Sequence, residues 1–135
     1  MRNLFDTINS NRCVAYMRCS TKKQKFDLQR AAIEKFCVEH NIDVIEWFSE
    51  YISGAASLSE RVELINAANL CEKEGCLLVC YSYDRLFRST PIMLDFFRNF
   101  EINTVFCTKP EGVKAEIITL ADYWTGVAAP VLGLI

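Results

Sequence analysis

The sequence predicts an α/β fold in which a mainly parallel central sheet is covered by helices on both faces. Short apolar runs alternate with amphipathic segments along most of the chain, a pattern typical of βαβ units. Hydrophobic residues make up 51% of the 135 residues and charged residues 24%. A chain of this length and composition folds as one globular domain rather than remaining disordered.

The first βα unit is expected to consist of a strand at about residues 12–18 and a helix from about 22 to 40. Thr21 and Gln24 have the spacing of a capping box, which predicts that this helix begins just after Ser20. The side chains expected to form its apolar stripe are Leu28, Ala32, Ile33, Phe36 and Cys37.

The second unit is expected to begin with a strand at about residues 43–48, followed by a loop over 50–58. A second capping box, Ser57 with Glu60, predicts the start of the next helix. Gly75 is expected to end that helix, because glycine adopts the left-handed conformation common after the last helical turn.

A third strand is expected at residues 77–82 and a fourth at about 104–107, with a loop over 109–114 beyond it. Between the two strands, Thr90 as N-cap and Pro91 at the first helical position predict another helix. The side chains expected on its core face are Met93, Phe96, Phe97 and Phe100.

The most informative residues for function surround Ser20, in the stretch AYMRCSTKKQ over 15–24. Alternate residues of a strand point to the same face, so Arg18 and Ser20 are expected to address one ligand. A helix start beside Ser20 would add free backbone N–H groups and a positive dipole end, which favour a phosphate. A serine in these surroundings is typical of a nucleophile for phosphoryl transfer.

A second stretch, YSYDRLFR over 81–88, follows the third predicted strand and contains Asp84, Arg85 and Arg88. Arginines three residues apart on a helical turn lie on one side of it. Two such guanidinium groups can clamp a phosphodiester and stabilise the charge of its transition state.

A third set, Glu50, Ser53 and Gly54, follows the apolar segment at 42–48. All three sets come after predicted strands and are therefore expected at the carboxyl edge of the sheet. Open α/β sheets bind their ligands at that edge.

Taken together, these residues resemble the catalytic domain of the serine recombinases, the resolvase, invertase and phage-integrase family. Order and spacing match across residues 12 to about 106. Cys19 stands where the family commonly has valine, Glu50 where it often has aspartate, and the gap from Gly54 to Arg61 is longer than usual. The matching positions are Tyr16, Arg18, Ser20, Thr21, Gln24, Glu50, Ser53, Gly54, Arg61, Asp84, Arg85, Leu86 and Arg88.

The resemblance implies a resolvase-like fold and DNA strand cleavage and rejoining that needs no metal or cofactor. Ser20 would attack a backbone phosphate and form a phosphoserine link, while Arg18, Arg85 and Arg88 stabilise the charge. Asp84 would either orient an arginine or assist proton transfer. The further residues expected to contact DNA or phosphate are Tyr16, Gln24, Glu50, Ser53 and Arg61.

The implied partners are DNA and, in a full-length protein, further copies of the chain in a dimer or tetramer. The expected organisation is an N-terminal extension at 1–11, a catalytic domain at 12–122 and an apolar tail at 123–135. The tail is interpreted as the start of a truncated dimerisation helix, since it is too short to span a bilayer. Residues 1–11 are polar and lack the apolar core of a signal peptide, so a cytoplasmic protein is expected. The resemblance implies a prokaryotic, phage or mobile-element origin.

Charge and cysteine content narrow the function classes. The net charge of −2 argues against strong DNA binding by the domain alone. Lys22, Lys23 and Lys25 suit a phosphate substrate or, equally, a solvated helix face. Seven cysteines without a CxxC pair are typical of reduced core thiols. With His40 as the single histidine, near a helix end, zinc binding and Ser-His-Asp chemistry are both disfavoured.

Two other functions remain open. The chain could be an inactive, truncated recombinase remnant that serves as an interaction module. It could also be a different α/β phosphate-binding protein that uses the same strand edge.

Overall fold

The computed structural model describes residues 11–23, 25–82, 86, 90–108 and 117–118. Five strands form one sheet in the order β2-β1-β3-β4-β5. The first four are parallel and β5 runs antiparallel to β4, which confirms the mainly parallel sheet. The strands are β1 (Arg12–Cys19), β2 (Asp43–Tyr51), β3 (Leu77–Cys80), β4 (Thr104–Phe106) and β5 (Ile117–Ile118).

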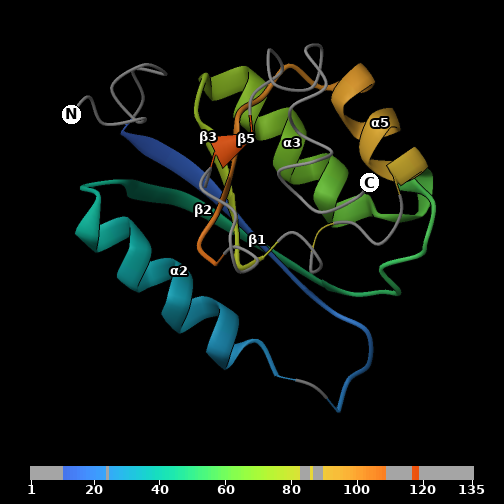
Figure 1. Ribbon diagram of the computed structural model, residues 1–135, viewed down its shortest axis with the longest axis horizontal. Coiled ribbons are helices and arrows are strands. Elements are labelled where there is room, and N and C mark those ends of the chain that lie inside the picture. Colours follow the sequence, from blue (N-terminus) through green and yellow to red (C-terminus); the bar gives the residue numbers. More distant parts are fainter. Residues whose placement is uncertain (1–10, 24, 83–85, 87–89, 109–116, 119–135) are drawn as a thin grey trace.

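Helices cover both faces of this sheet, as expected. α2 (Asp27–Glu39) lies on one face, and α3 (Val62–Glu74) and α5 (Thr90–Asn99) lie on the other (Figure 1). A short 3-10 helix, η1 (Leu58–Glu60), precedes α3. Within the described ranges, no helix is long and apolar enough to cross a membrane.

The central strand β1 divides the core into two clusters. Cys13, Ala15 and Met17 face α2, whereas Val14 and Tyr16 face α3 and α5. This alternation follows from the two-residue period of a strand. Every residue of β1 after Arg12 is buried, and all of these except Arg18 are apolar, so both faces of the strand are apolar as in other parallel sheets.

The start of α2 differs from the prediction. The helix begins at Asp27, with Phe26 as N-cap and no capping side chain, so the predicted capping box of Thr21 is wrong. Ser20 consequently does not sit at a helix N-terminus. Leu28, expected in the apolar stripe, is 68% exposed, because Ile33 and its neighbours on the buried face align with position 29 instead.

The start of α3 also differs. Ser57 makes no capping hydrogen bond, and its hydroxyl lies 3.2 Å from that of Ser59. The residues after Ser57 form η1, and the α-helix begins only at Val62. Its end is as predicted, since Gly75 adopts the left-handed conformation with φ of 63°.

α5 has the predicted core face, with Met93, Phe96, Phe97 and Phe100 all buried. Its first residue is Thr90, so the proline at position 91 lies within the first turn, where it is tolerated. β2 extends three residues beyond its predicted end and β3 stops two residues earlier. The predicted loop at 109–114 lies outside the described residues.

Candidate functional site

The order of the strands places a topological switch point at the carboxyl ends of β1 and β3. α2 joins β1 to β2 across one face of the sheet, whereas α3 joins β2 to β3 across the other. The connection that leaves β1 and the connection that enters β3 therefore lie on opposite faces of the sheet, and such a switch point is where open α/β sheets hold ligands. Ser20 follows directly after β1 at this position.

Arg18 and Ser20 are in contact, as the strand periodicity predicted. The Arg18 Nη1 atom donates a hydrogen bond to Ser20 Oγ at 3.1 Å and another to the Ile52 carbonyl oxygen at 2.8 Å. Arg18 is fully buried, whereas Ser20 is partly exposed. A permanently charged guanidinium therefore lies beside a hydroxyl that solvent can reach.

Gln29, which the sequence reasoning missed, holds the backbone of Arg18. Its side-chain oxygen accepts a hydrogen bond from the Arg18 N–H at 3.2 Å, and its amide nitrogen donates to the Arg18 carbonyl at 2.8 Å. The Gln29 amide is buried. It bonds both backbone polar groups of Arg18, as a neighbouring strand would, and does so from the α2 side of the sheet. The overlooked signal was spacing: Gln29 lies four residues before Ile33, on the apolar face of the helix.

Tyr16, Glu50 and Arg61 form one hydrogen-bonded network on the α3 face. The Tyr16 hydroxyl donates to Glu50 Oε2 at 2.6 Å and accepts from Arg61 Nη2 at 3.0 Å. Glu50 also accepts hydrogen bonds from the backbone N–H groups of Glu63 and Leu64, at 3.3 and 3.2 Å. A carboxylate there stabilises the first turn of α3 electrostatically.

Burial raises the pKa of Tyr16 above its ordinary value, and the nearby Arg61 opposes that effect. The phenol therefore stays protonated and continues to donate to Glu50. Arg61 is the N-cap residue of α3 and is fully buried, with its guanidinium 5.5 Å from the centre of the Tyr16 ring. It also donates to the carbonyl oxygen of Leu86, which links this network to the segment after β3.

Ser53 and Gly54 form a turn just after β2. The Ala55 N–H donates to Ser53 Oγ at 3.1 Å, and the Ala56 N–H donates to the Ser53 carbonyl at 3.1 Å. Ser53 is exposed and Gly54 is buried. The turn is joined to β1 by the Arg18–Ile52 hydrogen bond, so the ends of β1 and β2 are held together.

Four predicted site residues, Gln24, Asp84, Arg85 and Arg88, lie outside the described residues. Leu86, in the same stretch of chain, is described and fully buried. The hydrogen bond from Arg61 to its carbonyl oxygen holds Leu86, the middle residue of the DRLFR motif at 84–88, against the network.

The basic side chains around Ser20 differ in whether they are paired with a carboxylate. Lys22, Lys23 and Lys25 are exposed. Arg12 instead pairs with Glu74 at 3.5 Å, and Arg30 pairs with Glu34 at 2.9 Å. The three lysines are therefore the basic groups nearest to Ser20 in the chain that face solvent.

Across the described part of the chain, no group of three or more histidine, cysteine, aspartate or glutamate side chains is placed to hold a metal ion. His40 caps the end of α2, with its ring 4.4 Å from that of Phe36. All seven cysteines carry thiols, consistent with the sequence.

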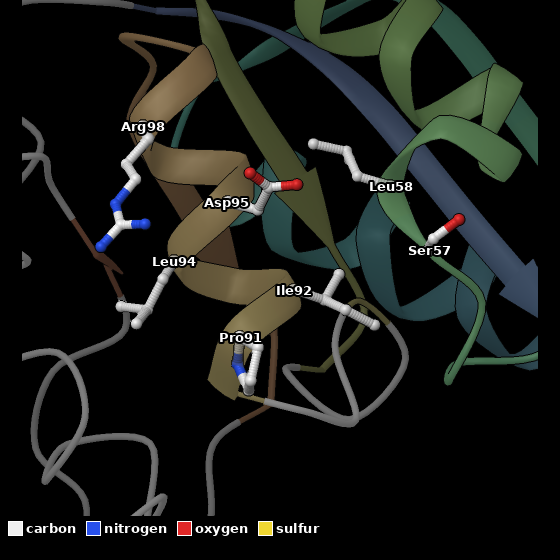
Figure 2. Close-up of a pocket in the computed structure, with 7 residues that line it drawn as sticks. All are labelled: Ser57, Leu58, Pro91, Ile92, Leu94, Asp95 and Arg98. Carbon is white, nitrogen blue, oxygen red and sulfur yellow. The ribbon is translucent and has the colours of Figure 1, made fainter.

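A pocket of about 400 Å³ lies apart from these residues, between η1 and α5. Figure 2 shows Asp95 and Ile92 on α5 facing Leu58 on η1, with Ser57 at one side. None of the predicted site residues lines it. The pocket therefore has no connection to the Arg18–Ser20 contact.

Comparison with known proteins agrees with this fold. Residues 13–114 match the family model described as "Resolvase, N terminal domain". A search of curated proteins gave no match.

Two solved structures share the fold. The N-terminal catalytic domain of TP901-1 integrase is similar with a TM-score of 0.66 and 19% identity, covering 88% of this chain and 92% of that one. The C-terminal catalytic domain of ISC1926 TnpA, described as an IS607-like serine recombinase, gives a TM-score of 0.59 and 22% identity. That match covers 73% of this chain and 71% of the other.

Proposed function

Since the chain belongs to the resolvase family, with the N-terminal domain of that family spanning residues 13–114, we propose that Ser20 is the nucleophile of a DNA recombinase. The observation that carries the proposal is the hydrogen bond from Arg18 to Ser20 Oγ at the switch point of the sheet. The substrate is the phosphodiester backbone of DNA.

In the proposed reaction, Ser20 Oγ attacks the phosphorus, so that an O–P bond forms and the bond from phosphorus to the 3′ oxygen breaks. The proton leaves Ser20 for a base, and the departing 3′ oxygen gains a proton. The charge-assisted hydrogen bond from Arg18 stabilises negative charge that develops on Oγ. The phosphoserine conserves the bond energy, so rejoining needs no nucleotide cofactor.

The remaining residues divide into two roles. Arg85 and Arg88 are proposed to clamp the phosphate oxygens, and Asp84 and Gln24 are proposed to belong to the same phosphate site.

Tyr16, Glu50 and Arg61 are proposed to hold the clamping residues in position from the α3 side of the sheet. Arg61 is buried against Tyr16 and bonded to the Leu86 carbonyl, so its contribution is to position the DRLFR segment. Ser53 is exposed at the end of β2 and is proposed to line the phosphate site.

Recombination by this mechanism requires several copies of the chain bridging two DNA sites. The apolar segment at 123–135 is proposed to contribute to that assembly. The chain is proposed to act on DNA through a separate DNA-reading domain, because its net charge of −2 gives little unspecific attraction to phosphate.

The test is formation of a covalent protein–DNA adduct. The full chain is fused to a DNA-binding module of known site, incubated with cognate DNA, and separated on a denaturing gel. Wild type is expected to give an adduct and Ser20→Ala none, a loss of at least about a hundredfold because the attacking oxygen is gone. Ser49→Ala, which removes an exposed hydroxyl on β2, is the matched control and should keep the adduct.

A fusion that folds and binds its site, yet gives no adduct with the wild-type chain, would support the inactive-remnant alternative. An adduct that persists in Ser20→Ala would place the nucleophile elsewhere. Binding of small phosphates without any adduct would favour a different phosphate-binding function.

A further inference from the structure

Two cysteines from different elements meet inside the core. Cys13 lies near the start of β1 and Cys37 lies near the end of α2, and their sulfur atoms are 3.8 Å apart. Cys13 is fully buried and Cys37 is 3% exposed. Both belong to the cluster that packs α2 against the sheet.

We propose that Cys13 and Cys37 form an oxidation site, at which a hydroperoxide converts the two thiols into a disulfide that links α2 to β1. A disulfide requires its sulfurs at about 2.05 Å, so each needs to move by only about an ångström from its present position. The proposal does not depend on the proposed recombinase function.

The chemistry balances with one hydroperoxide for each disulfide. The Cys37 thiolate attacks the peroxide, taking one oxygen as a sulfenic acid and releasing an alcohol, or water from hydrogen peroxide. Cys13 then attacks the sulfenic sulfur, so that the S–S bond forms and water leaves. Two thiols are oxidised and one peroxide O–O bond is reduced.

The surroundings assign these roles to the two sulfurs. The contact between the two sulfurs lowers the pKa of Cys37, while burial acts in the opposite direction. The same contact, together with burial, raises the pKa of Cys13. Cys37 is also the more accessible residue of the pair, at 3% exposure against 0% for Cys13, so the peroxide is expected to reach Cys37 first and Cys13 is the resolving thiol.

The competing thiol pair is Cys71 with Cys76, on either side of Gly75. Both line a cleft of about 160 Å³, so small oxidants reach them more easily. The thiol of Cys71, however, is held by a hydrogen bond to the Leu77 carbonyl at 3.4 Å, and burial raises the pKa of both sulfurs. These conditions disfavour the thiolate that oxidation requires.

The disulfide would close a loop that contains the candidate active-site strand. Residues 13–37 include Arg18, Ser20 and the helix turn with Gln29. The link would thus fix covalently the two elements that meet at the Arg18 backbone. Constraining the loop is expected to raise the thermal midpoint of the oxidised domain above that of the reduced one.

The experiment exposes the folded full chain to hydrogen peroxide, denatures it without reductant, alkylates the remaining thiols and measures the mass. Five of the seven cysteines should then be alkylated. Trypsin places the two residues in separate peptides, 13–18 and 36–61, each with a single cysteine. The expected product is these two peptides joined with the loss of two hydrogens, and dithiothreitol should separate them.

The matched variants are Cys37→Ala, which should abolish the joined peptides, and Cys80→Ala, which removes another buried thiol and should leave them. Alkylation of all seven cysteines after oxidation would overturn the proposal. So would a bridge between peptides 62–73 and 74–85, which would join Cys71 to one of the two cysteines of the second peptide, Cys76 or Cys80. The wild-type peptide map decides between these outcomes even where a variant folds poorly.

Discussion

Two side chains hold Ser20 in place, one by a hydrogen bond to its hydroxyl and the other by hydrogen bonds to the backbone of β1, which precedes it. Arg18 donates directly to Ser20 Oγ, and Gln29 fixes both backbone polar groups of Arg18. Gln29 reaches β1 from α2, whereas the Tyr16–Glu50 hydrogen bond acts from the opposite face of the sheet. The position of Ser20, the proposed nucleophile, therefore depends on helices of both layers.

At this scale we predict that Gln29→Ala lowers the free energy of unfolding by about 1–3 kcal/mol, because it leaves the Arg18 N–H and carbonyl without their buried partner. Urea denaturation measures this change. Leu28→Ala is the control, since Leu28 is exposed and its loss should cost less than about 0.5 kcal/mol. Equal costs for the two variants would contradict the role assigned to Gln29.

The sequence predicts one part of this site well and another poorly. Contact between Arg18 and Ser20 follows from the strand period alone, which is a local property. Gln29 was missed because the role of a polar residue on an apolar helix face depends on its hydrogen-bond partner. Here that partner is the Arg18 backbone, which the sequence does not place beside the helix. The Glu50–Tyr16–Arg61 network likewise joins three segments that are far apart in sequence, so its geometry comes only from the folded chain.

Among the elements, helix ends were predictable where backbone conformation decides and unpredictable where packing decides. Both expected capping boxes, at Thr21 and Ser57, are absent, since α2 begins only at Asp27 and α3 only at Val62, and neither has a capping side chain at its N-cap. Glu50, a residue of β2, supplies the N-terminal hydrogen bonds of α3 instead. The end of α3 at Gly75 needs only a left-handed residue, and glycine supplies it.

At the scale of elements we predict that Gly75→Ala destabilises the domain by about 1 kcal/mol. The cost is conformational, since an added Cβ would meet no atom within 4 Å at a φ of +63°. Thermal or urea unfolding measures it. Asn69→Ala, at an exposed position of α3, should be neutral or slightly stabilising because alanine is the better helix former. A neutral Gly75→Ala would show that this residue relaxes out of the left-handed region.

At the scale of the whole molecule, buried tyrosine and cysteine side chains that stay protonated make the stability of the fold depend on pH. Burial raises the pKa of Tyr16, Cys71 and Cys80 above their ordinary values. The unfolded chain therefore releases these protons at lower pH than the folded chain does. Stability is complete below the unfolded pKa values and decreases as the pH rises above them.

We accordingly predict that the urea midpoint, measured with reductant present, is constant near neutral pH and falls above about pH 8.5, where unfolded cysteines ionise. The fall should steepen above about pH 10, where unfolded tyrosine ionises as well. Tyr16→Phe should weaken only this second part. A midpoint that stays constant up to pH 10.5 would contradict the assignment of these groups as buried and protonated.

The strand order has a consequence for synthesis of the chain on the ribosome. β1 pairs with β2 on one side and with β3 on the other, and β3 lies more than fifty residues further along the chain. Until β3 emerges, one edge of this central, buried strand has no partner in the sheet, and such edges bind other extended chains. The strand that ends just before the candidate nucleophile is thus open to association with other chains during synthesis.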